Sequence, residues 1–250
     1  MSETLASGAP PAVSIVVPVR NEAGNIVPLV DEIAAALAKG PSFEIIYVND
    51  GSTDRTESEL TQLMASRPWL RQIKHQTSCG QSAAVASGVR HAGAGIIVTL
   101  DGDGQNDPAD FPKLLAALTD PAAPRRKLVM GNRTTRRDTW LRRLSSRVAN
   151  GVRAAILKDG TPDTGCGIKV FDRDVFMHMP RFRNMHRFMP ALFQREGFEV
   201  VSLPVNHRER TRGTSKYGLH NRLWVGIVDL FGVSWLIRRA SPRVPIHEET

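Results

Sequence analysis

Two carboxylates that follow an apolar segment are the residues of this chain best suited to chemistry. Asp101 and Asp103 come directly after residues 96–100, a β-prone run without a charge. Such a run predicts a strand buried on both faces, and ligands of open α/β sheets bind at the carboxyl ends of strands. Both carboxylates point to the same side of an extended chain, and Gln105 adds a carbonyl oxygen. These oxygens predict a site for a hard divalent cation and a diphosphate, with a solvated turn as the alternative.

Two earlier apolar segments also end in polar side chains. Residues 13–19 precede Glu22, and residues 43–48 precede Asn49 and Asp50. The carboxyl ends of parallel strands meet at one edge of a sheet. We therefore expect these side chains to join the two aspartates of the first motif in one site.

The elements that must position these residues alternate between strands and helices. Strands are predicted at 13–19, 43–48, 70–75, 96–100, 127–130, 168–171 and 198–205. Helices are predicted after residue 52 and at 25–37, 81–91, 108–118, 136–158, 185–196 and 219–239. This alternation predicts an α/β fold with a parallel sheet.

The composition of the 250-residue chain is that of a globular protein with an anionic partner. Hydrophobic residues make up 41% and charged residues 23%, and 33 Lys and Arg outnumber 25 Asp and Glu. The two cysteines suggest no disulfide framework and fit a reducing, cytoplasmic compartment. We expect no signal peptide, because residues 1–12 contain no apolar core preceded by positive charge, and no membrane-spanning segment, because no apolar run reaches about 18 residues. The seven histidines show no metal-ligand spacing.

The segments 16–22, 48–54 and 100–105 together resemble the family 2 inverting glycosyltransferases with the GT-A fold. A closer likeness, to the dolichyl- and polyprenyl-phosphate glycosyltransferases, rests on Asp101-X-Asp103-X-Gln105, Gly131-Asn132-Arg133, Asp163-X-Gly165 and Arg210-X-X-Gly213-X-Ser215-Lys216-Tyr217. The resemblance covers about residues 13–218. It implies a Rossmann-like, mostly parallel sheet flanked by helices, with amphipathic C-terminal helices.

The resemblance implies a donor site for a UDP- or GDP-linked sugar at the edge of the sheet. The residues expected to bind substrate there are Pro18, Arg20, Glu22, Asn49, Asp50 and Asp101. Asp50 would accept a hydrogen bond from the ring N–H of the base, and Asn49 stands where many relatives carry a second aspartate. Asp101, Asp103 and Gln105 would hold Mg²⁺ or Mn²⁺ against the diphosphate.

The acceptor implied by the resemblance is a polyprenyl phosphate, which would receive the sugar with inversion. Its second pKa is about 6, so at pH 7 it is mostly a dianion that can attack without a strong general base. Cations must then align it and offset its repulsion from the diphosphate. The expected catalytic residues are Asp103, Arg133, Arg210 and Lys216. Ser215 would donate a hydrogen bond to the phosphate, and Asp163 would contact the sugar or a phosphate loop.

Two helices are expected to associate peripherally with the cytoplasmic face of a membrane. Residues 140–157 combine an apolar helix face with arginines that include Arg153, and residues 223–237 are apolar and contain Trp224 and Trp235. A core helix with a solvated basic face is the alternative for both. The expected organisation is a disordered lead at 1–11, a catalytic domain at 12–218 with a donor half at 12–107 and an acceptor half at 108–218, and a membrane-associating helix and tail at 219–250.

Other functions compete with this one. A transferase of the same fold that acts on a hydroxyl acceptor usually carries a Gln-X-X-Arg-Trp motif, which this sequence lacks. A nucleotidyltransferase that makes sugar nucleotides would show a Gly-rich basic loop after the first strand, and residues 18–25 do not fit one. A non-enzymatic protein that binds a membrane surface or nucleic acid would account for the charge. Aromatic residues are not interleaved with the basic runs, so we expect no nucleic-acid partner.

Overall fold

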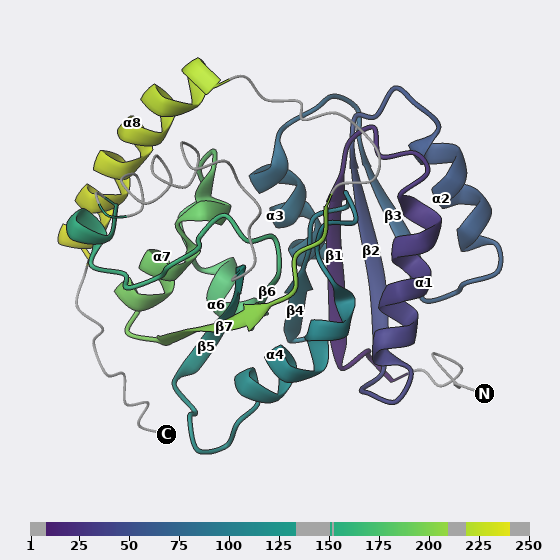
Figure 1. Ribbon diagram of the computed structural model, residues 1–250, viewed down its shortest axis with the longest axis horizontal. Helices are drawn as coiled ribbons and strands as arrows, with labels where there is room; N and C mark the ends of the chain where they lie inside the picture. Colours follow the sequence, from purple (N-terminus) through teal and green to yellow (C-terminus); the bar gives the residue numbers. More distant parts are fainter. Residues whose placement is uncertain (1–8, 134–150, 152, 210–218, 241–250) are drawn as a thin grey trace, which may run out of the picture.

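A computed structural model describes the protein over residues 9–133, 151, 153–209 and 219–240. Its centre is a seven-stranded sheet with the strand order β3-β2-β1-β4-β6-β5-β7 (Figure 1). The strands are β1 (Val13–Val19), β2 (Phe43–Asp50), β3 (Leu70–His75), β4 (Ile96–Thr99), β5 (Arg126–Arg133), β6 (Lys169–Asp172) and β7 (Glu199–Val205). Among the described strands only β6 is antiparallel to its neighbours, which confirms the mostly parallel α/β sheet.

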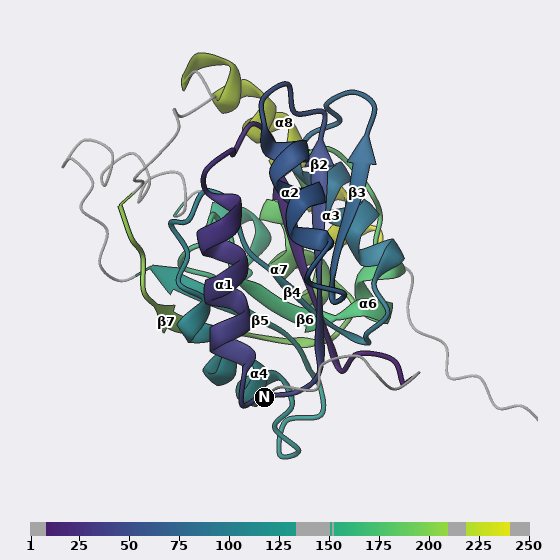
Figure 2. The same cartoon turned by 90° about the vertical axis from the view of Figure 1, so that its right-hand side faces the viewer.

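Helices cover both faces of this sheet (Figures 1 and 2). They are α1 (Ile26–Leu37), α2 (Thr56–Met64), α3 (Gln81–His91), α4 (Phe111–Leu118), α6 (Arg173–Met177), α7 (Met189–Arg195) and α8 (Leu219–Arg238), with 3₁₀ turns η1 (Pro108–Asp110) and η2 (Met185–Arg187). The single helix predicted at 185–196 is therefore divided into η2 and α7. A proline near the start of α7 is compatible with this division, because the first turn of a helix tolerates proline.

Alternate residues of β1 enter two separate cores, which explains why this strand is apolar almost throughout. Ile15 and Val17 pack in the core that includes α1, α2 and α4. Val16 packs in the core on the other face, which includes α3, α7 and part of α8. A strand covered on both faces needs apolar side chains in both directions.

The direction of β6 brings the second half of the chain to the carboxyl edge of the first half. Strands β1, β2 and β4 end at this edge, whereas β6 begins there, with Lys169 opposite Thr99. The loop before β6 approaches Asp101 closely. A Cβ atom at Gly167 would lie 2.4 Å from Asp101 Oδ2, so a larger residue would displace this carboxylate.

Helix α8 packs on the body of the protein and leaves an apolar stripe exposed. Leu230 and Val233 are buried in the core that contains α7. Val228, Phe231 and Trp235 are 67%, 65% and 61% exposed. Apolar residues of this helix are therefore not confined to its buried face. Within the described residues, no helix is both long enough and apolar enough to cross a bilayer.

The basic helix predicted around residues 140–157 lies mostly outside the described residues. Residues 153–157 are helical, and Arg153 is buried, where it donates hydrogen bonds to the Asp159 carboxylate and the Thr161 carbonyl. The prediction that Arg153 adds charge to a membrane-facing surface is therefore wrong. Its charge is neutralised inside the protein.

Candidate active site

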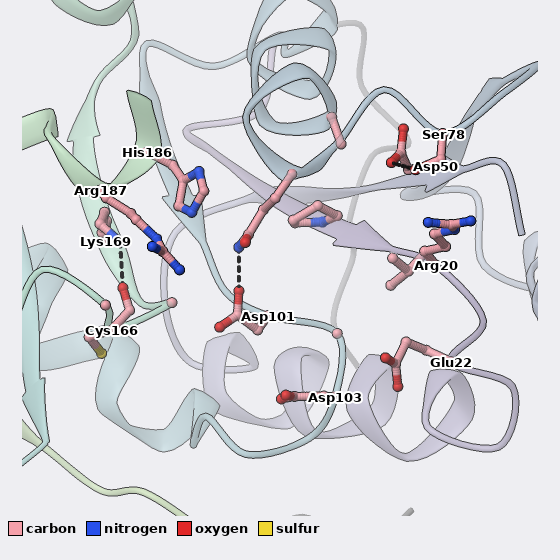
Figure 3. Close-up of a pocket in the computed structure, with 17 residues that line it drawn as sticks. Arg20, Glu22, Asp50, Ser78, Asp101, Asp103, Cys166, Lys169, His186 and Arg187 are labelled. Atoms are coloured by element: carbon pink, nitrogen blue, oxygen red, sulfur yellow. Dashed lines mark hydrogen bonds between the residues drawn. The ribbon is translucent and has the colours of Figure 1, made fainter. Parts of the chain in front are cut away.

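A cleft of about 330 Å³ opens at the carboxyl edge of the sheet (Figure 3). Its lining includes six residues predicted to bind substrate or metal: Pro18, Arg20, Glu22, Asp50, Asp101 and Asp103. It also includes five polar residues that the sequence did not single out: Ser78, Gln81, Lys169, His186 and Arg187. Both halves of the chain therefore form the site.

Two groups of opposite charge stand out in the lining, and Arg20 lies on the side of the acidic one. We call Glu22, Asp50, Asp101 and Asp103 the acidic wall, and Lys169, His186 and Arg187 the basic wall. Figure 3 shows the basic wall on one side of the cleft and Arg20, Glu22 and Asp50 on the other, with Asp101 between them.

Asp101 and Asp103 of the acidic wall have the chemistry of a divalent-cation site. Asp101 accepts a hydrogen bond from Gln81 Nε2 at 2.7 Å. Burial raises the pKa of Asp101, and the charge of Asp103 raises it further, although Lys169 and Arg133 oppose the rise. A cation bound to both carboxylates would relieve this repulsion. The oxygens present therefore fit the predicted Mg²⁺ or Mn²⁺.

Gln105, the third predicted metal ligand, is not among the residues that line the cleft. Its side-chain amide donates a hydrogen bond to the Arg208 backbone carbonyl at 3.4 Å. Its backbone carbonyl accepts a hydrogen bond from the Arg208 backbone N–H at 2.9 Å. Its backbone N–H donates to Asp103 Oδ1 at 3.1 Å. Gln105 thus links the aspartate motif to the start of the basic loop, and its role as a ligand stays a prediction.

Asp50 lines the cleft, but its carboxylate is heavily engaged by the protein. Oδ1 accepts from His75 Nδ1 and the Cys79 N–H, and Oδ2 accepts from Ser78 Oγ and the Gly80 N–H, all within 2.7–2.9 Å. Burial alone would raise the pKa of Asp50, but these hydrogen bonds lower it. Asp50 therefore fixes the loop before α3, and its predicted contact with a base remains a prediction.

Asn49, by contrast, does not line the cleft. It is buried, and its Oδ1 accepts a hydrogen bond from the Ser52 N–H at 2.9 Å. The predicted role of Asn49 in substrate binding finds no contact here, and its visible role is to hold the turn after β2.

The basic wall offers nitrogen donors from two distant segments. Lys169, the first residue of β6, is 4% exposed and donates to the Cys166 carbonyl. Burial lowers the pKa of Lys169, against the opposing effects of Cys166 and Asp101. Burial, with the charges of Lys169 and Arg187, lowers the pKa of His186 to about 3, so this imidazole is neutral at pH 7. The basic wall itself contains no carboxylate; Asp101, which adjoins Lys169 and His186, accepts a hydrogen bond from Gln81 and belongs to the predicted cation site.

Arg133 and Asp163, predicted as separate site residues, bind each other. Arg133 Nε and Nη2 donate to the two Asp163 carboxylate oxygens at 2.7 and 2.8 Å. Neither residue lines the cleft, although the loop from Gly165 to Gly167 that follows Asp163 does. A Cβ atom at Gly165 would lie 3.2 Å from Arg133 Nη2, so this pair packs against the loop.

Arg210, Ser215 and Lys216 lie outside the described residues, and their roles remain predictions. The chain that leads to them is fixed at Arg208, whose guanidinium binds Glu32 and Asp107 at 2.7 Å each. Together with the Gln105 contacts, these ion pairs place the start of the basic loop beside the aspartate motif.

Some of the cleft residues that were not predicted could have been recognised from the sequence. Lys169 interrupts an apolar strand, and a lysine in a buried strand is rare unless it has an anionic or polar partner. His186 could not have been recognised, because it lies in a segment predicted as helix and no local pattern separates it from the other six histidines. Gln81 begins an Ala-rich helix, where its side chain could have been assigned to solvent.

The sequence is similar to known transferases over most of its length. The family model described as Glycosyl transferase family 2 matches residues 14–179. A dodecaprenyl-phosphate galacturonate synthase from Rhizobium johnstonii is 35% identical over 237 residues, which are 92% of this chain and 68% of that protein. An undecaprenyl-phosphate 4-deoxy-4-formamido-L-arabinose transferase from Edwardsiella ictaluri is 34% identical over 211 residues, 83% of this chain and 63% of that protein. The chain thus spans about two thirds of the length of these relatives.

Solved structures share the fold at low sequence identity. A mannosyltransferase from Pyrobaculum calidifontis, in complex with GDP-Man and Mn²⁺, has a TM-score of 0.65 at 21% identity, covering 95% of this chain and 67% of that one. A glucosyl-3-phosphoglycerate synthase from Mycobacterium tuberculosis, with Mn²⁺, UDP-glucose and phosphoglyceric acid, has a TM-score of 0.66 at 20% identity, covering 90% and 80%. These matches show the GT-A fold. Because the family model and relatives above 30% identity cover most of the sequence, the chain belongs to glycosyl transferase family 2.

Proposed function

We propose that the protein transfers a sugar from a nucleoside diphosphate sugar to a polyprenyl phosphate, with inversion. The names of the two relatives describe synthesis or transfer of polyprenyl-phosphate sugars, and the solved structures of the same fold hold GDP-Man or UDP-glucose. The observation that carries the proposal is the division of the cleft into an acidic wall and a basic wall.

The basic wall favours an acceptor that is already an anion. A hydroxyl acceptor must lose a proton as it attacks, so it needs a general base in reach. Arg187 is a cation at pH 7, Lys169 donates to the Cys166 carbonyl and faces the negative charge of Asp101, and His186, with a pKa of about 3, is too weakly basic for that role. A phosphate monoester is mostly a dianion at pH 7 and needs cations and N–H groups to align it. This chemistry supports a polyprenyl phosphate rather than a hydroxyl acceptor.

The acidic wall would hold the donor. Asp101 and Asp103 would bind Mg²⁺ or Mn²⁺, which when bound neutralises charge on the leaving diphosphate. Arg20, Glu22 and Asp50 would form the nucleoside end, because they belong to the β1–β3 region of the sheet, which in this type of fold forms a mononucleotide-binding unit. This assignment keeps the division into a donor half at 12–107 and an acceptor half at 108–218 as part of the proposal.

The basic loop would close the acceptor site. Its described start lies beside the aspartate motif through the Gln105 and Arg208 contacts, which supports placing Arg210, Ser215 and Lys216 near the acceptor phosphate. Arg133, which is paired with Asp163, would act on the acceptor through the loop that the pair supports.

The acceptor lipid requires access to a membrane surface, which we place on the cytoplasmic face. Val228, Phe231 and Trp235 recur at helical spacing on the exposed side of α8, and Arg238 and Arg239 at its end are exposed. An exposed apolar stripe with an aromatic residue and flanking arginines suits a helix that lies in the headgroup region.

A transfer assay with matched acceptors tests the function. UDP- and GDP-linked sugars are incubated with Mn²⁺ and either a short polyprenyl phosphate or the corresponding polyprenol. We expect one donor to yield a lipid-phosphate sugar of inverted anomeric configuration, and no product with the polyprenol. Comparable transfer to the polyprenol would support a hydroxyl-directed enzyme instead.

A further inference from the structure

His186 is a cleft residue for which neither the family motifs nor the proposed metal site supplies a role. We propose that His186 donates its Nε2–H to an oxygen of the transferred sugar, and that Asp229 of α8 positions it through Asn184. This inference rests on the proposed function and assigns a sugar contact within that site.

The hydrogen bonds of His186 fix which nitrogen faces the cleft. Its Nδ1 lies 2.7 Å from Ser82 Oγ, and the same hydroxyl accepts the His186 backbone N–H at 3.3 Å. We assign the tautomer in which Ser82 Oγ, which accepts the backbone N–H, donates its own proton to Nδ1, so that the imidazole proton is on Nε2. Among the described residues Nε2 has no hydrogen-bond partner, and the ring lines the cleft. In this tautomer His186 presents one N–H donor, at Nε2, to a ligand that occupies this side of the cleft.

The order of strands along the edge indicates which part of the substrate that is. Asp50 ends β2, Asp101 follows β4, and Lys169 begins β6, so the three positions follow one another along the sheet. A donor with its diphosphate at Asp101 and its nucleoside at the β1–β3 region must extend its sugar towards β6 and η2. Figure 3 shows His186 on that side, next to Lys169 and Arg187 and across the cleft from Asp50. The Nε2–H of His186 thus lies at the sugar end of the bound nucleotide sugar.

The turn that carries His186 is attached to α8 by a side-chain hydrogen bond. Asn184, just before η2, has left-handed backbone angles (φ 63°, ψ 9°), and its Nδ2 donates to Asp229 Oδ2 at 2.9 Å. Met185 is buried in the core that also contains Leu230 of α8. This contact gives a reason for an acidic residue in an otherwise apolar stretch of α8. It makes Asp229 a positioning residue for the cleft.

Ligand binding by two His186 variants tests the contact. Calorimetry with Mn²⁺ compares UDP-glucose, UDP-galacturonate and GDP-mannose, each against its parent diphosphate. For the sugar nucleotide that wild type prefers, His186→Ala should weaken binding about tenfold, the effect of one hydrogen bond, while diphosphate binding changes less than twofold. His186→Gln, which keeps an N–H donor on a side chain of similar reach, should recover most of the loss. His178→Ala, at an exposed histidine whose ring bonds the Asp174 carbonyl, is the matched control.

Two Asp229 variants test the positioning. Asp229→Ala should reproduce the selective loss of sugar-nucleotide binding, and Asp229→Asn, which keeps a carbonyl oxygen for Asn184, should restore it. Equal loss of diphosphate and sugar-nucleotide binding in His186→Ala would overturn the proposal and make the turn merely structural. A raised KM for polyprenyl phosphate with unchanged sugar-nucleotide binding would assign the N–H to the acceptor, also against the proposal. A wild-type protein that binds none of the ligands would instead contradict the proposed function, and this inference with it.

Discussion

The acidic wall and the basic wall face the same cleft but are built in different ways. Residues of the acidic wall follow the ends of parallel strands, where a short local motif determines their place. The basic wall comes from the start of an antiparallel strand and from a 3₁₀ turn, and its position depends on contacts with α3 and α8. We therefore expect damage to the acidic wall to remove donor binding. Damage to the basic wall should spare the nucleotide and impair transfer.

The largest effect is expected at the aspartate motif. Asp103→Ala removes one of two carboxylates that would hold the metal. A bound metal would stabilise the charge of the transition state by several kcal/mol, so its loss should reduce transfer by about a thousandfold or more. Mn²⁺-dependent binding of the nucleoside diphosphate should be lost with it, while circular dichroism shows a folded protein. Asp174→Ala, at an aspartate with an 80% exposed side chain, serves as the control. Full activity of wild type in excess EDTA would contradict the metal site.

A smaller and more selective effect is expected at Lys169. Lys169→Met removes a buried positive charge from the basic wall, so transfer should fall about a hundredfold, as for loss of one donor that stabilises developing charge. Diphosphate binding should fall much less. Because the Lys169 charge opposes the rise in the Asp101 pKa, its loss raises that pKa further, so any binding deficit should be smaller at pH 8.5 than at pH 7.

Lys127→Met is the matched control for this change, because Lys127 pairs with Asp172 away from the cleft. If Lys169→Met and Lys127→Met transferred sugar equally well, the basic wall would have no part in catalysis. If Lys169→Met lost diphosphate binding in step with activity, the two walls would not divide the work as proposed.

The smallest effect is expected at the exposed stripe of α8. A variant with Val228, Phe231 and Trp235 all changed to Gln should bind anionic vesicles several-fold less tightly, because apolar area that enters the headgroup region is lost. Transfer to a short, water-soluble polyprenyl phosphate should stay near wild type. Val27→Gln, at a partly exposed apolar position on α1, is the control. Vesicle sedimentation measures the membrane binding of the triple variant, the control and wild type. If the triple variant bound vesicles as tightly as wild type, the membrane contact would lie elsewhere.

Much of the fold could be predicted because it follows from local patterns. The apolar strands β1, β2 and β4 and the polar residues at their ends are contiguous in sequence, so the sheet edge and the place of Asp101 and Asp103 were predictable. The side of the cleft formed by Lys169 was not, because it depends on the antiparallel register that sets Lys169 opposite Thr99. His186 depends on a left-handed residue, Asn184, and no sequence pattern there predicts that conformation.

The environment of single side chains could not be predicted from the sequence either. Asp50 and Arg133 were both expected to face substrate, yet each is engaged by protein groups: Asp50 by the loop before α3, and Arg133 by Asp163. Arg153 was expected to be a surface charge and is buried in an ion pair. The partners of Asp50 in that loop and of Arg133 lie 28 to 30 residues away along the chain, whereas Asp159 lies six residues after Arg153, just beyond the end of its helix.

In the proposed reaction the acceptor supplies its own negative charge, and the basic wall supplies no general base. The most direct test measures kcat/KM against pH with a polyprenyl phosphate and with the matching phosphonate, whose second pKa is higher, at saturating Mn²⁺ and donor. We predict that the rising limb of the profile shifts to higher pH with the phosphonate, because the dianion is the nucleophile. An identical profile for both acceptors would show that a group of the enzyme takes the proton, and the acceptor dianion would then not be the nucleophile that sets the rate.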